Sequence, residues 1–319
     1  MVKYSIIVPC YKAVKEIDNL YKMMSLNRDD YEVIFVDDCS GDGTFERMNC
    51  SPYKKSNFIV IQTESNSGPG GARNAAMKIA HGKYFMFCDC DDVYDLNVLE
   101  KADDFIKDKK NVDLLVFPFC TLRNGVRSKV DFYSVYKNGE KLDSCVIAAD
   151  QGMTTSKIFN ADIIRSYHLE MPQRMTGEDK CFVVNYAVYA KDIYKIDEVY
   201  YTYVMRGGSL THSAEKNNAN QKTTFEILYP VYHEHFPEIE QKMFANNHLL
   251  AKAKYFYQTK AGLKEIKAWY KKENARYPDW IKNVDYENQS IYRKLIYKAM
   301  YKNNALAIKA IMWIRKILY

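Results

Sequence analysis

Tyr84-Phe85-Met86-Phe87-Cys88-Asp89-Cys90-Asp91-Asp92 is an apolar run that passes directly into closely spaced acids. A short continuous apolar run suits a strand whose sheet is covered on both faces, so this run predicts a buried strand. The acids then follow at the carboxyl end of that strand, which is the edge where open α/β sheets bind their ligands. The stretch therefore indicates both a fold class and the place of a site.

The acids of this stretch admit two explanations. Carboxylates this close together repel one another unless a cation lies between them, and Mg²⁺ or Mn²⁺ takes oxygen ligands and often bridges carboxylates to phosphates. A solvated acidic turn that caps a helix beginning near Asp95 explains the same residues without any metal. Residues elsewhere in the chain are needed to decide between these two explanations.

Similar runs recur along the chain and alternate with helical periods, such as the one from Glu16 to Leu26. Strands and helices joined by short connections predict a doubly wound, mostly parallel α/β sheet. Pro9 is expected to end the first strand, because proline cannot donate to the ladder. Residues 120–145 carry turn signals and predict a hairpin. The predicted strands are Tyr4–Pro9, Tyr31–Val36, Phe58–Ile61, Val112–Phe119 and Tyr194–Val204.

Composition limits the class of protein. The 319 residues are 47% hydrophobic and 27% charged, which suits a soluble globular chain with one sizeable core and an appendage. No apolar run approaches the ~20 residues of a spanning helix, and the N-terminus enters a strand pattern without the regions of a signal peptide. The eight cysteines include no C-x-x-C pair, so a zinc site is not expected. We therefore expect a cytoplasmic protein.

Charge is distributed unevenly along the chain. Residues 1–212 hold 27 Lys and Arg against 30 Asp and Glu, whereas residues 213–319 hold 19 against 10. Apolar residues between Ile308 and Leu318 alternate with basic ones at a helical spacing, as in helices that lie on anionic membranes. We expect the helical, basic region 213–319 to contact a membrane surface, with packing on the main domain as the alternative. The region lacks a nucleic-acid-binding motif, so no nucleic-acid partner is expected.

Polar residues follow the ends of successive predicted strands, and a loop with three glycines, Asn66–Ala76, joins them. This loop is neither a Walker loop nor a dinucleotide fingerprint, and an ordinary helix-entry loop explains it equally well by itself. Together the residues suit a nucleoside diphosphate: Tyr11 could stack on the base, Asp38 could bond to it, and Arg73 with a metal on Asp91 could hold the phosphates.

Four motifs occur in order within residues 1–212: S-I-I-V-P-C-Y-K, V-D-D-C-S-G-D-G-T, N-S-G-P-G-G-A-R-N-A-A and F-C-D-C-D-D. They resemble the motifs of the family 2 glycosyltransferases of the GT-A fold, and G-E-D-K-C-F at 177–182 resembles the downstream E-D motif of that family. The resemblance implies a GT-A domain over residues 1–212. Residues 213–319 match no part of the family, and their helical periods predict a C-terminal helical appendage. The resemblance implies an inverting enzyme of the bacterial polysaccharide or glycolipid type.

The resemblance also implies residue roles. Asp179 would be the general base, although an acid in the first turn of a helix is favourable on dipole grounds alone. His212 would be a further metal ligand, with a plain surface histidine as the alternative. The nucleotide sugar would be held by Pro9, Tyr11, Asp38, Arg73 and Asp89. Metal ligands would be Asp91 and Asp89. Residues of the acceptor side or of a closing loop would be Glu178, Lys157 and Arg206.

The expected reaction follows from these roles. One base and no protein nucleophile imply a single in-line displacement at the anomeric carbon, which inverts its configuration. A Q-x-x-R-W motif is absent, which favours transfer of one sugar per encounter from a nucleotide sugar, a UDP-sugar by preference, to a glycan or lipid-linked acceptor. We expect Mg²⁺ or Mn²⁺ as cofactor and the cytosolic face of the membrane as the location. A nucleotidyltransferase and a non-catalytic nucleotide-sugar-binding protein remain as alternatives.

Overall fold

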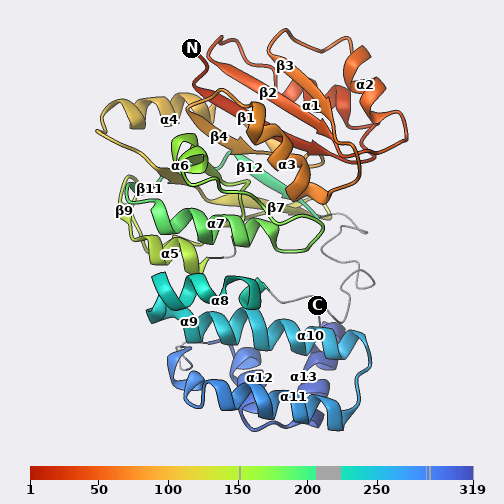
Figure 1. The fold of residues 1–319 in the computed structure, drawn as a ribbon, viewed down its shortest axis with the longest axis vertical. Coiled ribbons are helices and arrows are strands. Elements are labelled where there is room, and N and C mark those ends of the chain that lie inside the picture. The colour runs from red at the N-terminus through yellow and green to blue at the C-terminus, as the bar shows by residue number, and fades with distance from the viewer. Residues whose placement is uncertain (151, 206–223, 285, 287–288, 319) are drawn as a thin grey trace. The chain divides into compact units, whose positions relative to one another are not determined.

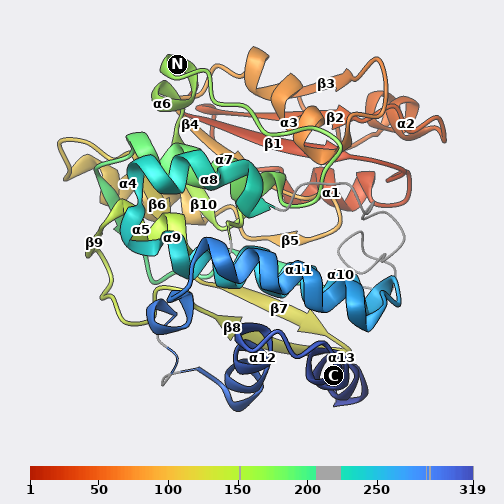
Figure 2. The same cartoon turned by 60° about the horizontal axis from the view of Figure 1, so that its bottom comes forward.

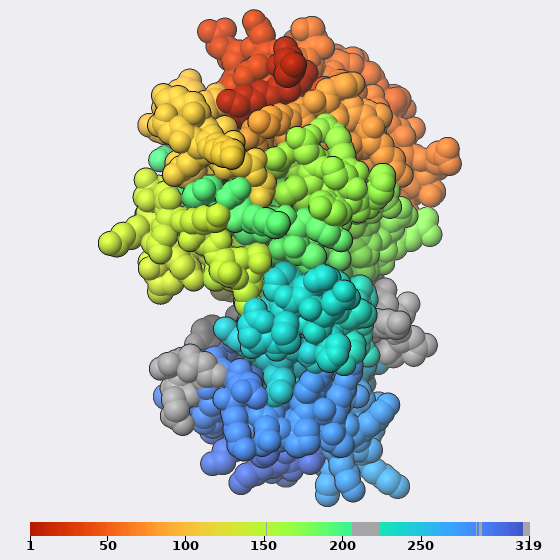
Figure 3. All heavy atoms as spheres, turned by 60° about the vertical axis from the view of Figure 1, so that its left-hand side comes forward, coloured from red at the N-terminus to blue at the C-terminus, as the bar shows by residue number. Residues whose placement is uncertain are grey.

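The computed structural model describes residues 1–319 except 151, 206–223, 285, 287–288 and 319, and it describes residues 315–318 without their side chains. Contacts divide the chain into two compact units, unit 1 at Met1–Ser209 and unit 2 at Leu210–Tyr319. Figure 3 shows each range of residues gathered into a body of its own, red through green and cyan through blue.

Unit 1 is built on an eight-stranded sheet with the order β3-β2-β1-β4-β10-β6-β11-β9. The first four strands in this order are parallel to one another, and β10 is antiparallel to both β4 and β6. The sequence therefore predicted the mostly parallel half correctly. The strands are β1 (Tyr4–Cys10), β2 (Tyr31–Asp37), β3 (Phe58–Gln62), β4 (Tyr84–Phe87), β6 (Leu114–Val116), β9 (Lys141–Leu142), β10 (Lys157–Asn160) and β11 (Ile193–Lys195).

A second, four-stranded sheet has the order β5-β12-β7-β8. Its strands β7 and β8 form the hairpin that the turn signals between residues 120 and 145 predicted. The strands of this sheet are β5 (Val93–Tyr94), β7 (Phe119–Arg123), β8 (Val126–Val130) and β12 (Tyr201–Val204).

Helices cover both faces of the main sheet, as a doubly wound arrangement requires. Alternate residues of β1, such as Ile6 and Val8, join one core with Leu20 of α1 and Leu99 of α4. On the other face, the ring of Phe87 lies 5.6 Å from that of Phe182 on α7. Figure 2 shows α1 and α3 on opposite sides of β1 and β2. The helices are α1 (Ile17–Met23), α2 (Thr44–Cys50), α3 (Gly68–Ile79), α4 (Val98–Lys107), α5 (Ser144–Ala149), α6 (Ala161–Ser166) and α7 (Glu178–Tyr189).

The structure corrects three predicted strand boundaries. Strand β1 continues through Pro9 to Cys10, because Pro9 lies beyond the last residue that pairs with β4, where the ladder requires no N–H. The predicted strand Val112–Phe119 is divided between β6 and β7, since Pro118 interrupts the backbone donors between the two sheets. The predicted strand Tyr194–Val204 is divided in the same way into β11 and β12.

Unit 2 consists of helices in the part that the structure describes (Figure 1). Its interior is aromatic: the buried Trp280 donates its indole N–H to Asn274 Oδ1 at 2.7 Å, and Tyr270 donates to the carbonyl of Leu249 at 2.9 Å. No described helix of the chain has the length and apolar character needed to cross a membrane. The helices are α8 (Thr224–His235), α9 (Pro237–Met243), a π-helix (Phe244–Leu249), α10 (Leu250–Gln258), α11 (Leu263–Arg276), a 3₁₀-helix (Trp280–Asn283), α12 (Ile291–Tyr301) and α13 (Ala305–Leu318).

Candidate active site

The carboxyl ends of β1, β2 and β4 lie together at one edge of the main sheet. Cys10 at the end of β1 pairs with Asp37 at the end of β2, and Ile7 pairs with Phe87 at the end of β4. The residues that follow these strands are therefore brought to one edge. This edge is where the sequence predicted a ligand.

Arg73 on α3 joins acids from two other segments. Its guanidinium is buried, with 3% of the side chain exposed. Nη2 donates to Asp89 Oδ1 at 2.6 Å, and Nη1 donates to Asp179 Oδ1 at 2.9 Å and lies 3.5 Å from Glu178 Oε1. We call Arg73, Asp89, Glu178 and Asp179 the Arg73 cluster. It unites residues that are more than 100 positions apart in the sequence.

The Arg73 cluster holds more negative than positive charge, and the pKa values of its carboxyls reflect this. Burial, followed by the charge of Asp179, raises the pKa of Glu178 to about 7. Burial also raises the pKa of Asp179, while the positive charge of Arg73 opposes that rise. One buried arginine therefore does not fully offset three neighbouring carboxylates. Such an excess of negative charge suits the binding of a further cation.

Asp38 holds the glycine loop. Its Oδ1 accepts hydrogen bonds from the Ser67 amide, the Ser67 hydroxyl and the Thr63 hydroxyl, each at 2.9 Å. Its Oδ2 accepts from the Gly68 amide at 2.8 Å. Because each carboxylate oxygen carries two lone pairs, Oδ2 can take one more donor. The sequence predicted a contact to a nucleotide here, and it did not predict the contacts to the loop.

The glycines of this loop allow a protein segment to approach closely. A Cβ on Gly70 would clash with the carbonyl oxygen of Pro172, so only glycine fits there without a shift. Asn74 and Met171 exchange two hydrogen bonds of 2.8 Å beside it. The segment that leads into α7 is thereby fixed against the start of α3. The loop consequently couples the two helices that carry Arg73 and Asp179.

Two further predicted nucleotide residues lie at or beside the end of β1. Tyr11 is exposed, and its ring has the Lys12 ammonium 5.3 Å from its centroid. Pro9 is buried within the strand, opposite Val36. An exposed aromatic ring at this edge can stack on a base, whereas Pro9 shapes the strand beneath it.

The predicted metal ligands differ in exposure. Asp89 is partly buried and bonded to Arg73, whereas Asp91 is exposed. Among the described residues, no group of three or more His, Cys, Asp or Glu side chains is arranged to hold a metal ion. The donor set still fits Mg²⁺ or Mn²⁺, which is commonly bound by one or two carboxylates while phosphates and water complete the shell. His212 and Arg206 lie outside the described residues.

Asp92, the last of the three acids, was not predicted as a separate residue of interest. It is buried and accepts hydrogen bonds from the Tyr201 hydroxyl and the Val204 amide, both at 2.8 Å. Burial, followed by the charge of Asp89, raises the pKa of Asp92 to about 7. No local pattern in the sequence indicates this contact, because its partners are more than 100 residues away.

Lys157, predicted on the acceptor side, is buried in contacts within unit 1. Its buried Nζ lies 3.0 Å from Asp150 Oδ2 and donates to the Met153 carbonyl at 2.7 Å. Asp150 also accepts a hydrogen bond from the Tyr133 hydroxyl. Lys180, the residue after Asp179, donates to the carbonyls of Ala148 and Asp150. We call Lys157, Lys180, Asp150 and Tyr133 the lysine network. These internal contacts occupy the Lys157 ammonium, and its role on the acceptor side stays a prediction.

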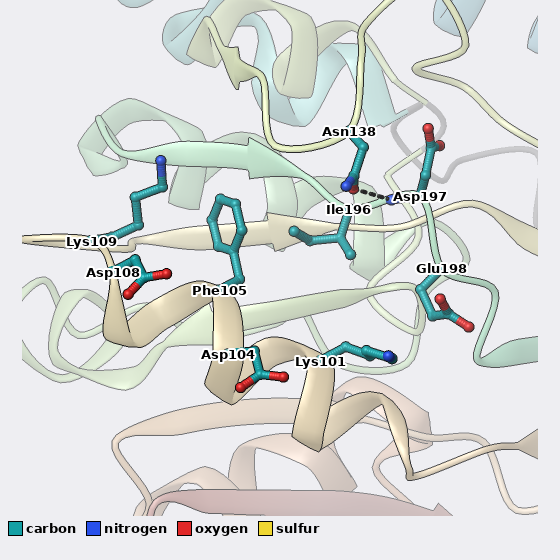
Figure 4. Close-up of a pocket in the computed structure, with 9 residues that line it drawn as sticks. All are labelled: Lys101, Asp104, Phe105, Asp108, Lys109, Asn138, Ile196, Asp197 and Glu198. Carbon is teal, nitrogen blue, oxygen red and sulfur yellow. Dashed lines mark hydrogen bonds between the residues drawn. The ribbon is translucent and has the colours of Figure 1, made fainter.

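A surface hollow elsewhere in unit 1 has a volume of about 590 Å³. Figure 4 shows its side chains, which come from α4, from the residues directly after α4, and from the segments that contain Asn138 and residues 196–198. It shares no residue with the Arg73 cluster. Its lining residues are Lys101, Asp104, Phe105, Asp108, Lys109, Asn138, Ile196, Asp197 and Glu198.

Comparisons with known proteins show which family the chain resembles. The family model described as glycosyl transferase family 2 matches residues 5–167. The poly(ribitol-phosphate) beta-N-acetylglucosaminyltransferase TarS of Staphylococcus aureus (strain MW2) is 31% identical over 225 residues, which cover 67% of this chain and 38% of that protein. The chain spans 33% to 38% of the length of such curated relatives.

Two solved structures show the same fold. The crystal structure of S. aureus TarS 1–349 in complex with UDP has a TM-score of 0.67 at 21% identity, and the match covers 100% of this chain and 92% of that one. The mannosyltransferase PcManGT from Pyrobaculum calidifontis, in complex with GDP-Man and Mn²⁺, has a TM-score of 0.55 at 15% identity and covers 97% and 86%. The GT-A-like α/β fold predicted from the sequence is thereby confirmed. With more than half of its residues matched by the family model, this chain belongs to the family 2 glycosyltransferases.

Proposed function

We propose that the chain transfers one sugar from a nucleoside-diphosphate sugar, a UDP-sugar by preference, to a hydroxyl group in cell-surface polysaccharide biosynthesis. The observation that carries this proposal is the Arg73 cluster. It joins the acids after β4 to the first turn of α7 through one buried guanidinium. Residues 1–212 would form the catalytic domain. The choice of donor is supported by the solved relative in complex with UDP. The choice of pathway is supported by relatives named as glycosyltransferases of poly(ribitol-phosphate).

The donor would lie along the edge formed by β1, β2 and α3. Tyr11, which is exposed directly after β1, stacks on the base of the nucleotide. Asp38 Oδ2, which accepts one hydrogen bond from the Gly68 amide, accepts a second from the base. Pro9 supports Tyr11 from within the strand. Arg73 orients the carboxylates around the diphosphate and places its own charge beside it. Asp89, already bonded to Arg73, lies at the diphosphate end of this edge.

A divalent cation would be held by Asp89 and Asp91, and His212 would be a further candidate ligand. When bound, Mg²⁺ or Mn²⁺ neutralises charge on the departing phosphates. The remaining ligands would come from the donor and from water, which suits a site with two protein carboxylates. Support comes from the excess of negative charge in the Arg73 cluster and from the Mn²⁺ with which one solved relative is in complex.

Asp179 would accept the proton of the acceptor hydroxyl. Its contact with Arg73 at 2.9 Å favours the ionised form, which a base requires, against the effect of burial. Glu178 beside it, with a pKa of about 7, is the acceptor-side candidate that can donate or accept a hydrogen bond at neutral pH. Attack by one hydroxyl in a single displacement inverts the anomeric configuration. Arg206 remains a candidate for a closing loop.

The acceptor would be a glycan or a lipid-linked glycan at the cytosolic face of the membrane, and no nucleic acid takes part. Unit 2 would supply the contact with the anionic membrane surface. Relatives named for poly(ribitol-phosphate) make a polyol-phosphate polymer one acceptor to test, alongside lipid-linked saccharides.

Calorimetric titration with UDP and GDP, with and without Mn²⁺, tests the donor site. We expect UDP to bind and Mn²⁺ to strengthen the binding. Absent binding, or binding that EDTA leaves unchanged, contradicts the proposed site. Release of UDP from a panel of UDP-sugars then tests the reaction, and release of pyrophosphate instead would indicate a nucleotidyltransferase.

The Asp179→Asn variant tests the base. General-base catalysis typically contributes ~10²–10⁴-fold, so UDP release should fall by about this factor while the affinity for UDP is unchanged. Asp162→Asn is the matched control, because Asp162 is an exposed acid in the first turn of α6. Equal activity in the two variants would remove Asp179 from the mechanism. Binding of UDP without turnover by the unaltered protein would favour a non-catalytic binding protein.

A further inference from the structure

Helices α12 and α13 of unit 2 form a strongly basic hairpin. Residues 291–314 contain five Lys and Arg residues and no acid. The two helices lie side by side (Figures 1 and 2), and the Tyr292 hydroxyl donates to Met312 Sδ at 3.2 Å between them. The hairpin is thus a defined part of the unit's surface rather than a free end.

Large apolar side chains lie exposed along both helices. On α12, Ile291 is 79% exposed and Leu295 follows one turn later. On α13, Leu306 is 67% exposed and Trp313 is 57% exposed, with Ile314 beside it. Residues four or seven positions apart lie on the same face of a helix. Each helix therefore presents one apolar stripe to the outside.

These stripes are not the faces that hold the unit together. Ile296 and Met300 on α12, and Ile308 and Met312 on α13, are buried instead. The hairpin already has a core-facing side, so the exposed stripes are additional apolar surface. Large apolar side chains that lie exposed in rows, beyond those that form a core, suit a site of interaction with another protein or with a membrane.

Lysines accompany the apolar stripe of α12. Lys298 and Lys302 are exposed and follow Leu295 by one and two helical turns. No acid follows Glu287 in the sequence. Exposed lysines beside leucine, isoleucine and tryptophan are typical of helices in a membrane interface, where tryptophan lies at the level of the headgroups.

We propose that the exposed faces of α12 and α13 dock onto an anionic lipid bilayer, with Leu306, Trp313 and Ile314 entering the headgroup region and Lys298 and Lys302 contacting lipid phosphates. The surface would hold the enzyme beside a lipid-linked acceptor. This role beside the acceptor rests on the proposed function, but binding of the surface to a bilayer can be tested without any sugar transfer. A second copy of this chain fits less well, because the cores of protein–protein interfaces are depleted of lysine.

Binding to vesicles tests the proposal. The full chain should co-sediment with vesicles of phosphatidylcholine and phosphatidylglycerol in equal parts, and not with vesicles of phosphatidylcholine alone. The Lys298→Gln/Lys302→Gln variant should bind about 30-fold more weakly, which corresponds to the loss of two lysine contacts with anionic lipid. Added salt should weaken the binding of the unaltered protein, because it screens these charges.

Apolar contact is tested by a second pair of variants. Leu306→Ser/Trp313→Ser should reduce vesicle binding, whereas Val126→Ser/Val135→Ser should not. The second variant is a matched control, because it removes two exposed apolar side chains from unit 1. Circular dichroism verifies that both variants are folded.

Trp313 provides a direct measurement of depth. Trp280 is buried and Trp269 is half-buried, so quenching by brominated lipid should come from Trp313 and disappear in Trp313→Phe. Equal binding to neutral and anionic vesicles, no binding at all, or quenching that survives in Trp313→Phe would overturn the proposal. A change of mass in analytical ultracentrifugation that follows the same variants, without vesicle binding, would assign the surface to a second copy. Loss of UDP binding with vesicle binding intact would contradict only the proposed function.

Discussion

Two groups of buried charges lie on either side of one turn of α7, and they are built differently. Asp179 contacts Arg73, whereas the next residue, Lys180, contacts the backbone of residues 148–150. The Arg73 cluster has one cation for three carboxylates, and the lysine network has two cations for one carboxylate. In the first, 35% of the Asp89 side chain and 27% of Asp179 remain exposed. In the second, Lys157 and Asp150 are 0% and 3% exposed.

The difference indicates that the Arg73 cluster is a functional site and that the lysine network is a structural support beside it. In the lysine network, backbone carbonyls of Ala148, Asp150 and Met153 accept from the excess ammonium groups, so its polar groups satisfy one another internally. In the Arg73 cluster, Glu178 and Asp179 keep raised pKa values, and Asp89 and Asp179 stay partly exposed to solvent. Proteins tend to leave such local conflicts unresolved at functional sites. Substitutions in the two groups should therefore have different effects on stability and on donor binding.

Removal of Arg73 should have the largest effect. Arg73→Met leaves Asp89, Glu178 and Asp179 without their cation, and breaking a buried ion pair lowers the free energy of unfolding by about 3–5 kcal/mol. Urea unfolding followed by circular dichroism measures this loss. The loss should shrink at mildly acidic pH, where the carboxyls with raised pKa values become protonated. Arg123→Met, at an exposed position on β7, is the control and should change stability little. A pH-independent loss would show that the three acids do not share the charge of Arg73.

Removal of the acid from the lysine network should lower the stability of the protein but leave its affinity for UDP unchanged. Asp150→Asn leaves the buried Lys157 and Lys180 without their carboxylate, and we expect a loss of about 2–4 kcal/mol, slightly smaller because the carbonyl contacts remain. Asp104→Asn breaks the exposed pair with Lys107 and should lower stability by less than ~1 kcal/mol. Calorimetry should show unchanged UDP affinity in Asp150→Asn. A loss of UDP binding in the folded variant would break the distinction between site and support.

The free energy of unfolding should depend on pH through two largely buried carboxyls, those of Asp92 and Glu178. Asp92 and Glu178 have folded pKa values of about 7, above their unfolded values, because burial disfavours their charged forms. The folded state therefore binds protons more tightly, and stability should rise as the pH falls through these values. From about pH 7.5 to about pH 5.5, in EDTA, we expect a gain of about 1–3 kcal/mol in the free energy of unfolding.

Groups with lowered pKa values should not interfere in this window, and the raised pKa of Asp179 acts in the same direction as those of Asp92 and Glu178. Asp150, Asp103 and Asp30 have lowered pKa values, so their contributions change only below their unfolded value of 3.8. Burial lowers the pKa of Lys180 to about 8, so its contribution changes above that pH. Asp92→Asn should reduce the gain. A stability that falls between the two pH values would contradict the raised pKa values.

The sequence predicted the parts whose determinants are local. The continuous apolar runs of β1, β2 and β4 specify buried strands, and the acids after β4 mark the sheet edge. The convergence of Arg73 with Asp179 required the resemblance, since no local pattern joins positions 106 apart. The antiparallel β10 could not be predicted, because a strand of four residues that begins with a lysine has no distinctive pattern. The lysine network escaped prediction for the same reason, as lysines are ordinarily surface residues.

Two glycines extend the comparison to the backbone, with smaller expected effects. A Cβ on Gly152 would clash with Cα of Lys180 in the lysine network, and Gly152 also has a positive φ of +77°. A Cβ on Gly70 would clash with the Pro172 carbonyl beside the Arg73 cluster. Both alanine variants should lower the free energy of unfolding by about 1–3 kcal/mol, with Gly152→Ala the larger because it adds backbone strain to the clash.

Gly262→Ala is the matched control for both variants. Nothing lies within 4 Å of a Cβ at that position and its φ of −70° suits alanine, so the substitution adds neither clash nor backbone strain. Because Gly262 is the N-cap of α11, where alanine is less favourable, we expect a loss of at most ~1 kcal/mol. Titration with UDP then separates the two regions: Gly70→Ala shifts the start of α3 against the segment before α7 and should weaken binding, whereas Gly152→Ala should not. If Gly152→Ala weakened UDP binding more than Gly70→Ala, the donor would instead bind near the lysine network, because a backbone shift affects a nearby ligand most.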